Sequence, residues 1–500
     1  MRARAATSTR RFVGFLALLA SPCCGRTDLD LFARADEGNA GKSSSGASAR
    51  GGSPSSGQGG TGVSIGGGPT TAGTSAGGIS SGGVATAGSS AAGESGAGAS
   101  GAGAAGEGGA PGEAGAPGEG GSPSVPDAIN LALGAFHTCA TFDGGSLRCW
   151  GSQPFHGHPE SDVIGDDEAP AAVGDVDVGA AVVTDVSASW YHTCAVVGDG
   201  KVRCWGNDSA GRLGYGNSGT IGDDETPADA GDVDVGGPVE GIATGPTQTC
   251  ANLVDGRVRC WGSNEDGELG YPGSEAIGDD ETPAQAGDVD VGGFALQVAA
   301  GYHHTCVLLD GGTVRCWGNG TGVDILGEVD LGGSAVQIVA GLHHRCALLQ
   351  GGNVRCWGAN YNGPLGYGNY DVVGDNETPA EAGDVDVGGT VLQLAAGDYS
   401  TCALLEGGGV RCWGLGDKGE LGYGNTETIG DDETPAEVGD IDLGGPAVHI
   451  DVGFLHACAV LVGGKIRCWG RGGTGALGYG NLEDIGDDET PASAGDVETH

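Results

Sequence analysis

Short apolar segments with alternating character recur along residues 127–500 and predict β-strands. In one stretch, three such segments are Leu296 to Ala299, Cys306 to Leu309 and Val314 to Trp317, separated by a turn and a Gly-Gly turn. A fourth segment, Asp288-Val289-Asp290-Val291, places both valines on one face and both aspartates on the other. We expect it to be the outer strand of its unit, where outward carboxylates discourage edge-to-edge pairing with another molecule.

This pattern repeats seven times. Seven cysteines each have a second cysteine ten residues later, and the intervals between the first cysteines are 55, 56, 56, 40, 56 and 56 residues. The fourth unit therefore lacks one loop. Four short strands per unit, with no segment of helical period between them, predict an all-β fold, a seven-bladed β-propeller over residues 127–500.

Three motifs resemble a known family. They are Gly301-Tyr302-His303-His304-Thr305-Cys306, Val314-Arg315-Cys316-Trp317-Gly318 and the stretch Gly419 to Gly424. They resemble the regulator of chromosome condensation repeats, whose propellers have seven blades, and exported bacterial members with a Cys pair in each blade look closest. The resemblance implies the fold but not one activity, because similar propellers serve as nucleotide exchange factors, chromatin binders and secreted inhibitors of β-lactamases.

The spacing of ten residues within each cysteine pair predicts how the two cysteines lie on their strands. With a three-residue loop such as Asp310-Gly311-Gly312, residues 306 and 316 lie opposite each other on adjacent antiparallel strands. An export signal and one pair per unit favour seven disulfides, and zinc binding is the weaker alternative, because metal sites usually bring two Cys closer together in sequence. The predicted pairs are Cys139–Cys149, Cys194–Cys204, Cys250–Cys260, Cys306–Cys316, Cys346–Cys356, Cys402–Cys412 and Cys458–Cys468.

The amino terminus predicts export. Residues 1–24 contain four arginines ahead of the apolar run Phe12 to Ala20, which is typical of a signal peptide and too short to span a membrane. Leu18 to Cys24 resembles a bacterial lipobox, so Cys23 or Cys24 is a candidate for lipidation. Pro22 departs from that pattern, and ordinary signal cleavage with secretion is the alternative. Either way, we expect a protein at the bacterial cell surface, as an outer-membrane lipoprotein, or outside the cell.

Residues 25–126 are rich in Gly, Ser and Ala and contain few large apolar side chains, so we expect a disordered linker that acts as a tether.

The net negative charge of the chain lies in residues 127–500. The chain has 66 acidic and 22 basic side chains, a formal net charge of −44, and residues 127–500 carry all of it. Such a charge opposes binding of nucleic acid or an anionic bilayer, leaving membrane contact to a lipid anchor. We expect a monomer with a protein as its partner.

A comparison of the seven units shows which residues recur at equivalent positions and which residues vary. The Trp after each second Cys, the Arg before it and the His two residues before most first Cys recur, so we interpret them as structural. The two positions after the turn Gly, or after Ser189 in the second unit, vary and should form a ring on one propeller face, here called the turn ring. Its aromatic and histidine members are the predicted binding anchors: Phe136, Trp190, Tyr191, Tyr302, His303, His343, Tyr399 and Phe454. The alternative is that these side chains fill the gap between neighbouring turns.

No catalytic constellation or cofactor motif stands out, and we predict a binding protein rather than an enzyme. Ile-Gly-Asp-Asp-Glu-Thr-Pro recurs, as at Ile221 to Pro227; we interpret it as a solvated turn, with calcium binding as the alternative. His156, His158 and Glu160 form a lone cluster of metal-ligand types. The rival functions are a glycan-active enzyme, a calcium-dependent carbohydrate-binding module and, by family analogy, a guanine-nucleotide exchange factor.

Overall fold

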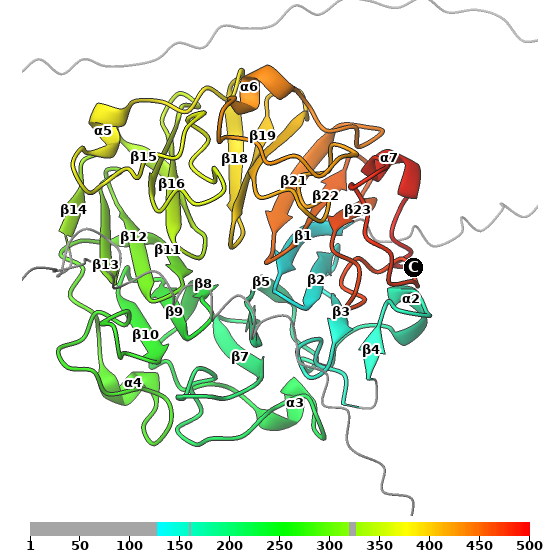
Figure 1. Cartoon of the computed structure of the whole chain (residues 1–500). Helices are drawn as coiled ribbons and strands as arrows, with labels where there is room; N and C mark the ends of the chain where they lie inside the picture. The colour runs from blue at the N-terminus through cyan, green and yellow to red at the C-terminus, as the bar shows by residue number, and fades with distance from the viewer. Residues whose placement is uncertain (1–127, 160–161, 320–326) are drawn as a thin grey trace, which may run out of the picture. The chain divides into compact units, whose positions relative to one another are not determined.

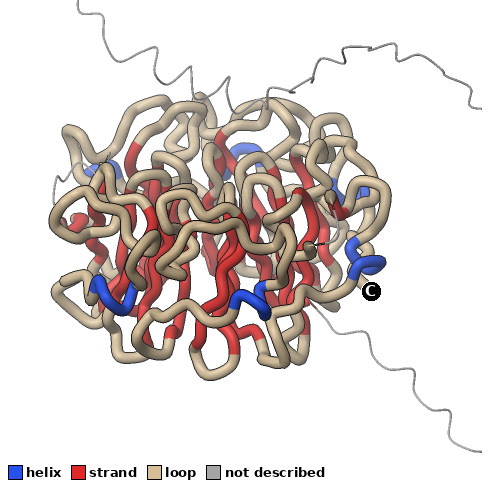
Figure 2. Tube along the Cα trace, turned by 90° about the horizontal axis from the view of Figure 1, so that it is seen from below, coloured by secondary structure: helices blue, strands red, loops and turns tan. Residues whose placement is uncertain are grey.

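The computed structural model describes residues 128–159, 162–319 and 327–500, and in these ranges seven antiparallel sheets surround a central axis (Figure 1). Each sheet is one blade, and its first strand lines the central channel. Seen from the side, the strands run between two ends that are covered by loops (Figure 2). The predicted all-β, seven-bladed propeller is confirmed. The expected signal sequence and linker, residues 1–24 and 25–126, lie outside the described residues. The first described residue, Ala128, begins the first strand of the propeller.

The strands of blades 1 to 4, in chain order, are β1 (Ala128–Leu133), β2 (His137–Phe142), β3 (Leu147–Ser152) and β4 (Val163–Ile164); β5 (Val183–Ala188), β6 (His192–Val197) and β7 (Lys201–Gly206); β8 (Val239–Thr244), β9 (Gln248–Leu253) and β10 (Val258–Gly262); β11 (Ala295–Gly301), β12 (His304–Leu309), β13 (Val314–Gly318) and β14 (Gly327–Val329). Those of blades 5 to 7 are β15 (Ala335–Ala340), β16 (His344–Leu349) and β17 (Val354–Gly358); β18 (Val391–Ala396), β19 (Ser400–Leu405) and β20 (Val410–Gly414); β21 (Ala447–Val452), β22 (His456–Leu461) and β23 (Ile466–Gly470).

Single helical turns follow the acidic motif: α2 (Pro170–Val173), α3 (Pro227–Ala230), α4 (Pro283–Ala286), α5 (Pro379–Ala382), α6 (Pro435–Val438) and α7 (Pro491–Ala494). Each begins with Pro, whose fixed φ suits the first helical position. No helix within the described ranges is long and apolar enough to cross a membrane.

The second and third strands of each blade are joined by a disulfide. Cys306 lies directly opposite Cys316 in the register of β12 and β13, and the same holds for the other six pairs. The Cα atoms of the paired cysteines are 4.0–4.1 Å apart. All seven predicted disulfides are confirmed, and each closes one hairpin.

The outer edge of the blades differs from the prediction. In blade 3, the expected strand at Asp288 to Val291 is reduced to one bridge, between Val289 and Val258, and a second bridge joins Ile277 to Gly262. Between these bridges the chain leaves the sheet, because the acidic turn and α4 interrupt the pairing. The predicted facing is correct: Val289 and Val291 are buried and Asp290 is exposed.

The recurrent arginine holds this outer segment. Arg259 Nε lies 2.9 Å from Asp288 Oδ1, while its Nη1 donates to the carbonyl of Val235, which belongs to the preceding outer segment. Arg467 repeats both contacts with Asp496 and Leu443. Five of the seven arginines, including Arg203, Arg355 and Arg411, make both contacts and so join their own outer segment to that of the neighbouring blade, which explains why the residue recurs.

The ring closes by contacts between blades 7 and 1. The last segment of the chain pairs within its own blade, since Val497 N donates to Ile466 O. Blade 1 meets blade 7 through Trp150 Nε1, which donates to Ala476 O at 2.8 Å, and through Thr138 Oγ1, which lies 2.8 Å from His456 Nε2. Closure therefore uses the same side chains that join the other blades.

Candidate binding site

The turn ring lies at the end of the channel where the first strands finish. All eight predicted anchors belong to one network of ring contacts. Trp190 stacks on Tyr302 with ring centroids 6.1 Å apart and packs against Phe454 at 5.4 Å. Seven of the eight side chains are half-buried, and Phe454 is buried. The structure thus gathers these residues into one aromatic surface.

Trp190 crosses the channel. Its Nε1 donates a hydrogen bond of 2.6 Å to Asp398 Oδ2, which links blade 2 to blade 6. Burial raises the pKa of the Asp398 carboxyl to about 8, although the hydrogen bond from Trp190 opposes that rise. The polar atom of Trp190 is therefore engaged inside the ring, and its aromatic face is the part that contacts the other turn-ring side chains.

Phe155 extends the aromatic surface, and sequence reasoning did not assign it to the ring. It belongs to the insertion of the first unit, and its ring lies 6.0 Å from that of Phe136 and 6.4 Å from that of Tyr191. Arg212 also lies over the Tyr191 ring, with its guanidinium carbon 5.2 Å from the ring centroid. Tyr191 is consequently held by a cation and two phenylalanines.

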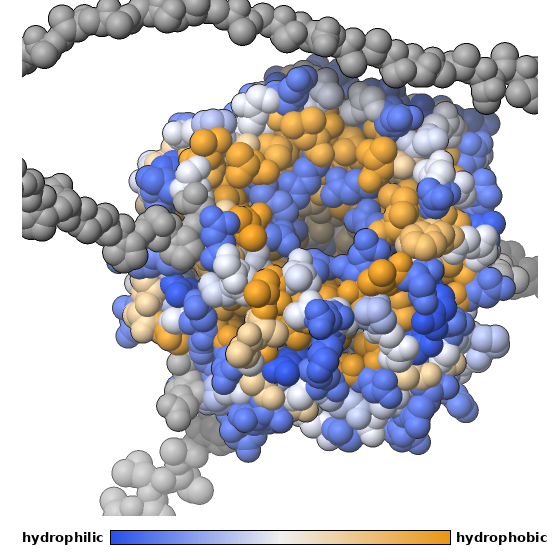
Figure 3. Space-filling view, turned by 180° about the vertical axis from the view of Figure 1, so that it is seen from behind, coloured by the Kyte–Doolittle hydropathy of each residue, from blue (hydrophilic) through white to orange (hydrophobic). Residues whose placement is uncertain are grey.

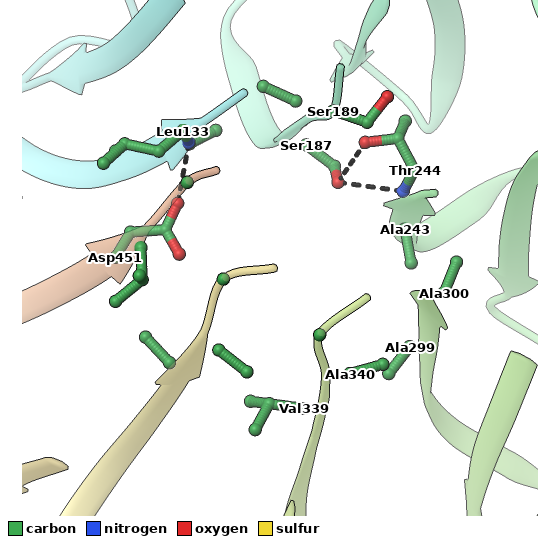
Figure 4. Close-up of a pocket in the computed structure, with 18 of the residues that line it drawn as sticks. Leu133, Ser187, Ser189, Ala243, Thr244, Ala299, Ala300, Val339, Ala340 and Asp451 are labelled. Atoms are coloured by element: carbon green, nitrogen blue, oxygen red, sulfur yellow. Dashed lines mark hydrogen bonds between the residues drawn. The ribbon is translucent and has the colours of Figure 1, made fainter. Parts of the chain in front are cut away.

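The channel below this surface encloses a cavity of about 290 Å³. Small side chains such as Ala243, Ala299 and Ala340 line it (Figure 4). Its polar groups differ between blades: Asp451 Oδ2 accepts a hydrogen bond of 2.7 Å from Leu133 N, and Ser187 Oγ lies 2.9 Å from Thr244 Oγ1 (Figure 4). Because these lining side chains are small, they leave space in the channel that larger side chains would fill.

Three carboxyl groups line the channel, Asp185, Asp398 and Asp451, together with His449. Burial raises the pKa of Asp185 to about 6 and that of Asp451 to about 7. No Lys or Arg lies among the described lining residues. Sequence reasoning missed this acidic lining because Asp185 and Asp451 occupy positions where the other blades carry different residues, so no recurring motif contains them.

A belt of amides joins the first strands near the opposite end of the channel. Gln337 Nε2 donates to Leu394 O and its Oε1 accepts from Leu394 N, both at 2.9 Å. Gln297 makes the same pair of bonds to Ile338, and Gln393 makes them to Ile450. Each glutamine therefore satisfies two backbone groups of the next blade.

The recurring histidines are structural, as predicted: four of the five contact a threonine side chain of the next blade, whereas His304 Nδ1 lies 3.0 Å from Tyr302 O in its own turn. His137 Nε2 lies 2.6 Å from Thr193 Oγ1, and His344 Nε2 lies 2.8 Å from Thr401 Oγ1. Burial lowers the pKa of His137 and His344 to about 3 and that of His456 to about 4. These imidazoles are neutral ties between blades.

The acidic motif brings three carboxylates together in five repeats. In each repeat, carboxylate oxygens of two Asp and one Glu lie within 4.8 Å of one another, and these are the residues that could hold a cation: Asp166, Asp167 and Glu168; Asp223, Asp224 and Glu225; Asp279, Asp280 and Glu281; Asp431, Asp432 and Glu433; Asp487, Asp488 and Glu489. Burial and the neighbouring Asp224 raise the pKa of Glu225 to about 7. In the separate cluster, the rings of His156 and His158 lie 5.7 Å apart, and Glu160 is outside the described residues.

Family profiles agree with the fold. The regulator of chromosome condensation (RCC1) repeat matches residues 183–212, 296–321, 335–363 and 391–420, and a second profile of the same repeat matches residues 255–308. The chain carries RCC1 repeats. The repeats identify the architecture of this propeller, whereas the residue types in its turn ring and channel lining vary from blade to blade.

Curated relatives include the ultraviolet-B receptor UVR8 of Arabidopsis thaliana, which is 29% identical over 368 residues, 71% of this chain and 79% of the relative. The human E3 ubiquitin-protein ligase HERC2 is 37% identical over 82 residues, which are 16% of this RCC1-repeat chain and 2% of HERC2. Among solved structures, yeast RCC1 (Prp20) with bound Kap60 gives a TM-score of 0.55 at 18% identity, covering 73% of this chain and 84% of the other. Human WBSCR16 gives 0.52 at 19% identity, covering 65% and 84%. These similarities to solved structures concern the fold.

Proposed function

We propose that this RCC1-repeat chain is an exported, surface-tethered protein-interaction scaffold whose turn ring supplies the anchors. The observation that carries the proposal is the network of ring contacts that joins all eight turn-ring candidates at one end of the channel. Aromatic side chains contribute strongly to binding surfaces, and rings already held by their neighbours lose little conformational freedom on binding. A protein partner is supported by yeast RCC1, which binds Kap60.

The partner that suits this surface is basic. His303, a member of the turn ring, lies 3.1 Å from Asp266 and 3.5 Å from Glu268, so carboxylates adjoin the aromatic surface. With a formal net charge of −44, the chain repels polyanions at long range and attracts cationic surfaces.

The binding experiment is photo-crosslinking of the full chain to cell-envelope extract, followed by identification of the crosslinked protein and measurement of its affinity. The Tyr191→Ala, Tyr399→Ala double variant should lose the partner by at least about tenfold in affinity. Tyr361→Ala is the matched control, because Tyr361 is an exposed tyrosine outside the turn ring and 65% of its surface is accessible. Equal affinity of both variants for the partner would remove the turn ring from the proposal.

Export and tethering are tested separately. If Cys23 or Cys24 carries a lipid, the full chain should fractionate with membranes, and the Cys23→Ser, Cys24→Ser double variant should appear in the soluble extracellular fraction. Labelled palmitate incorporated by the parent chain and not by the variant confirms the anchor. Soluble secretion of both chains would leave a secreted scaffold, and retention of both in the cytoplasm would overturn export.

A further inference from the structure

Every blade has a β-bulge at the same place, the start of its first strand. The pairing with the second strand skips one residue in each case. A bulge redirects the side chain of the extra residue. All seven skipped residues are exposed: Ile129, Thr184, Glu240, Leu296, Val336, Leu392 and Val448. They lie at the opposite end of the first strands from the turn ring.

Five of these residues are aliphatic and belong to consecutive blades, 4 to 7 and then 1. We call Leu296, Val336, Leu392, Val448 and Ile129 the bulge crescent; their side chains are 48–58% exposed. They account for five of the fourteen exposed large hydrophobic residues in the described ranges, so this is not random scatter over the surface. The end of the propeller where the first strands begin shows apolar residues around a central hollow (Figure 3).

The fold does not require aliphatic residues here. Thr184 and Glu240 occupy the same bulge in blades 2 and 3, with the same register shift. Exposed aliphatic side chains gain nothing for folding at such a position, and a contiguous apolar surface of this kind marks an interaction site. Phe294 and Val462 widen the surface: Phe294 directly precedes β11, and Val462 N bonds to Pro446 O beside the start of β21.

The charged groups around the crescent are acidic. The hairpin turn of each blade lies at this end, since Asp310 N donates to Phe294 O and Glu406 N donates to Thr390 O. Asp310, Glu406 and, in blade 1, Asp143 are exposed. The crescent also borders the channel mouth, where its members immediately precede uncharged lining residues such as Gln297 and His449.

Blades 2, 3 and 7 carry a basic residue at or just before the start of the third strand, and in each blade it is already paired. Lys201 lies 2.7 Å from Asp232, Arg257 binds Asp255 and Asp288, and Lys465 lies 2.6 Å from Asp496. At the corresponding positions blades 1, 4, 5 and 6 carry Ser146, Thr313, Asn353 and Gly409. The turns of blades 1, 4 and 6 therefore offer negative charge with no basic residue at the start of the adjoining third strand, whereas the turn of blade 5 carries the neutral Gln350.

We propose that the bulge crescent binds an amphipathic segment of a partner protein, with aliphatic side chains on the crescent and Lys or Arg side chains over the acidic turns. The apolar contact and the charge complementarity act together. The acidic turns repel an anionic segment, and the aliphatic crescent offers no favourable contact to a purely polar segment. This second surface is independent of the turn ring. A second copy of the chain is a poor occupant, because it presents the same negative charge.

The test uses the full chain and fluorescent synthetic peptides, with binding measured by anisotropy at physiological salt. A helical leucine and lysine peptide should bind, whereas leucine and glutamate or serine and lysine peptides of equal length should not. The Leu296→Thr, Leu392→Thr variant should bind the leucine and lysine peptide about tenfold more weakly. It should fold normally, since Thr184 occupies this bulge in blade 2.

The Val182→Thr, Val254→Thr variant is the matched control, because both valines are exposed at the same end in blades 2 and 3, outside the crescent. Its affinity should stay within about twofold of the parent. The proposal would be overturned if both variants weakened binding equally. It would also be overturned if the leucine and lysine peptide did not bind, or if the leucine and glutamate peptide bound equally well. Sedimentation of the parent as a dimer that the crescent variant dissociates would also overturn it, in favour of a second copy.

Discussion

Trp190 and Asp398 occupy the same register position in different blades, where the scaffold elsewhere carries Ala135, Pro246, Tyr302, Leu342 and Phe454. Their hydrogen bond of 2.6 Å crosses the channel and leaves a carboxyl group inside a largely apolar ring. Burying an ionised carboxyl is costly, so the folded chain favours its protonated form. One pair of side chains thus gives this end of the propeller a sensitivity to pH.

The Asp398→Asn variant should be more stable than the parent at pH 8 and nearly equal to it at pH 4.5. The folded pKa of Asp398 is raised to about 8, whereas the unfolded group loses its proton near its ordinary value of 3.8. The parent therefore loses stability as pH rises from 4 to 8, while an amide has no proton to lose. We expect a difference in the free energy of unfolding of about 2 kcal/mol or more at pH 8, measured by urea denaturation. An Asn variant that is less stable at pH 8 would contradict this.

At the scale of elements, the disulfides explain how short hairpins remain ordered in an acidic chain. Each bridge joins directly opposed residues and closes a short loop, which restricts the unfolded chain. Replacing Cys402 and Cys412 by Ala should lower the free energy of unfolding by about 2 kcal/mol. Denatured parent protein should show no free thiol from the fourteen propeller cysteines before reduction and fourteen after it. Thiols that a chelator releases without reductant would instead support the zinc alternative.

The amide belt makes a second prediction at this scale. Gln337→Leu leaves Leu394 N and Leu394 O without their partner between blades 5 and 6. An unsatisfied backbone group is costly, so the free energy of unfolding should fall by about 2 kcal/mol. Gln350→Leu is the matched control, because Gln350 lies in an exposed turn of the same blade and its substitution should change stability little. Equal effects of both substitutions would show that Gln337 is not a tie between blades.

The elements that the sequence predicts well are those that pair locally. Three strands per blade and the seven disulfides follow from alternation and from the spacing of cysteines, because hairpin partners lie close in sequence. The outer segment was predicted as a strand; it forms the short strand β14 in blade 4, but only single bridges in blades 2 and 3, where a turn and a helical turn interrupt it. The amide belt, the ties from Arg259 to Val235 and the bulge crescent depend on contacts or exposure between blades, which a repeat pattern does not reveal.

On the scale of the whole molecule, the repeats specify the arrangement of the seven blades, whereas the proposed binding surfaces consist of residues that differ between blades. The fold and the turn-ring positions could be predicted because each blade repeats them. The contacts across the channel could not, since Trp190 and Asp398 are 208 residues apart and unique to their blades. The two ends also differ in chemistry: half-buried aromatic rings at one, exposed aliphatic side chains bordered by carboxylates at the other.

The large negative net charge of the chain affects its stability. With 66 acidic and 22 basic side chains, the chain repels itself at low ionic strength, and this repulsion opposes the compact state. The ion pairs that salt would weaken, such as Lys201 with Asp232, are exposed and contribute little. Added NaCl should therefore raise the melting temperature by several degrees. A fall in melting temperature would mean that the ion pairs outweigh the repulsion.

The same measurement distinguishes general screening from calcium binding at the five acidic triads. The carboxylates of each triad lie within 4.8 Å of one another, close enough for repulsion and for a shared cation. If they are solvated turns, CaCl₂ and MgCl₂ at equal concentration should raise the melting temperature equally, because both cations screen by charge alone. Binding of about five calcium equivalents in calorimetry, with a rise specific to calcium, would reverse that interpretation. The Asp431→Asn, Asp432→Asn variant should abolish one equivalent in that case and change nothing specific to calcium otherwise.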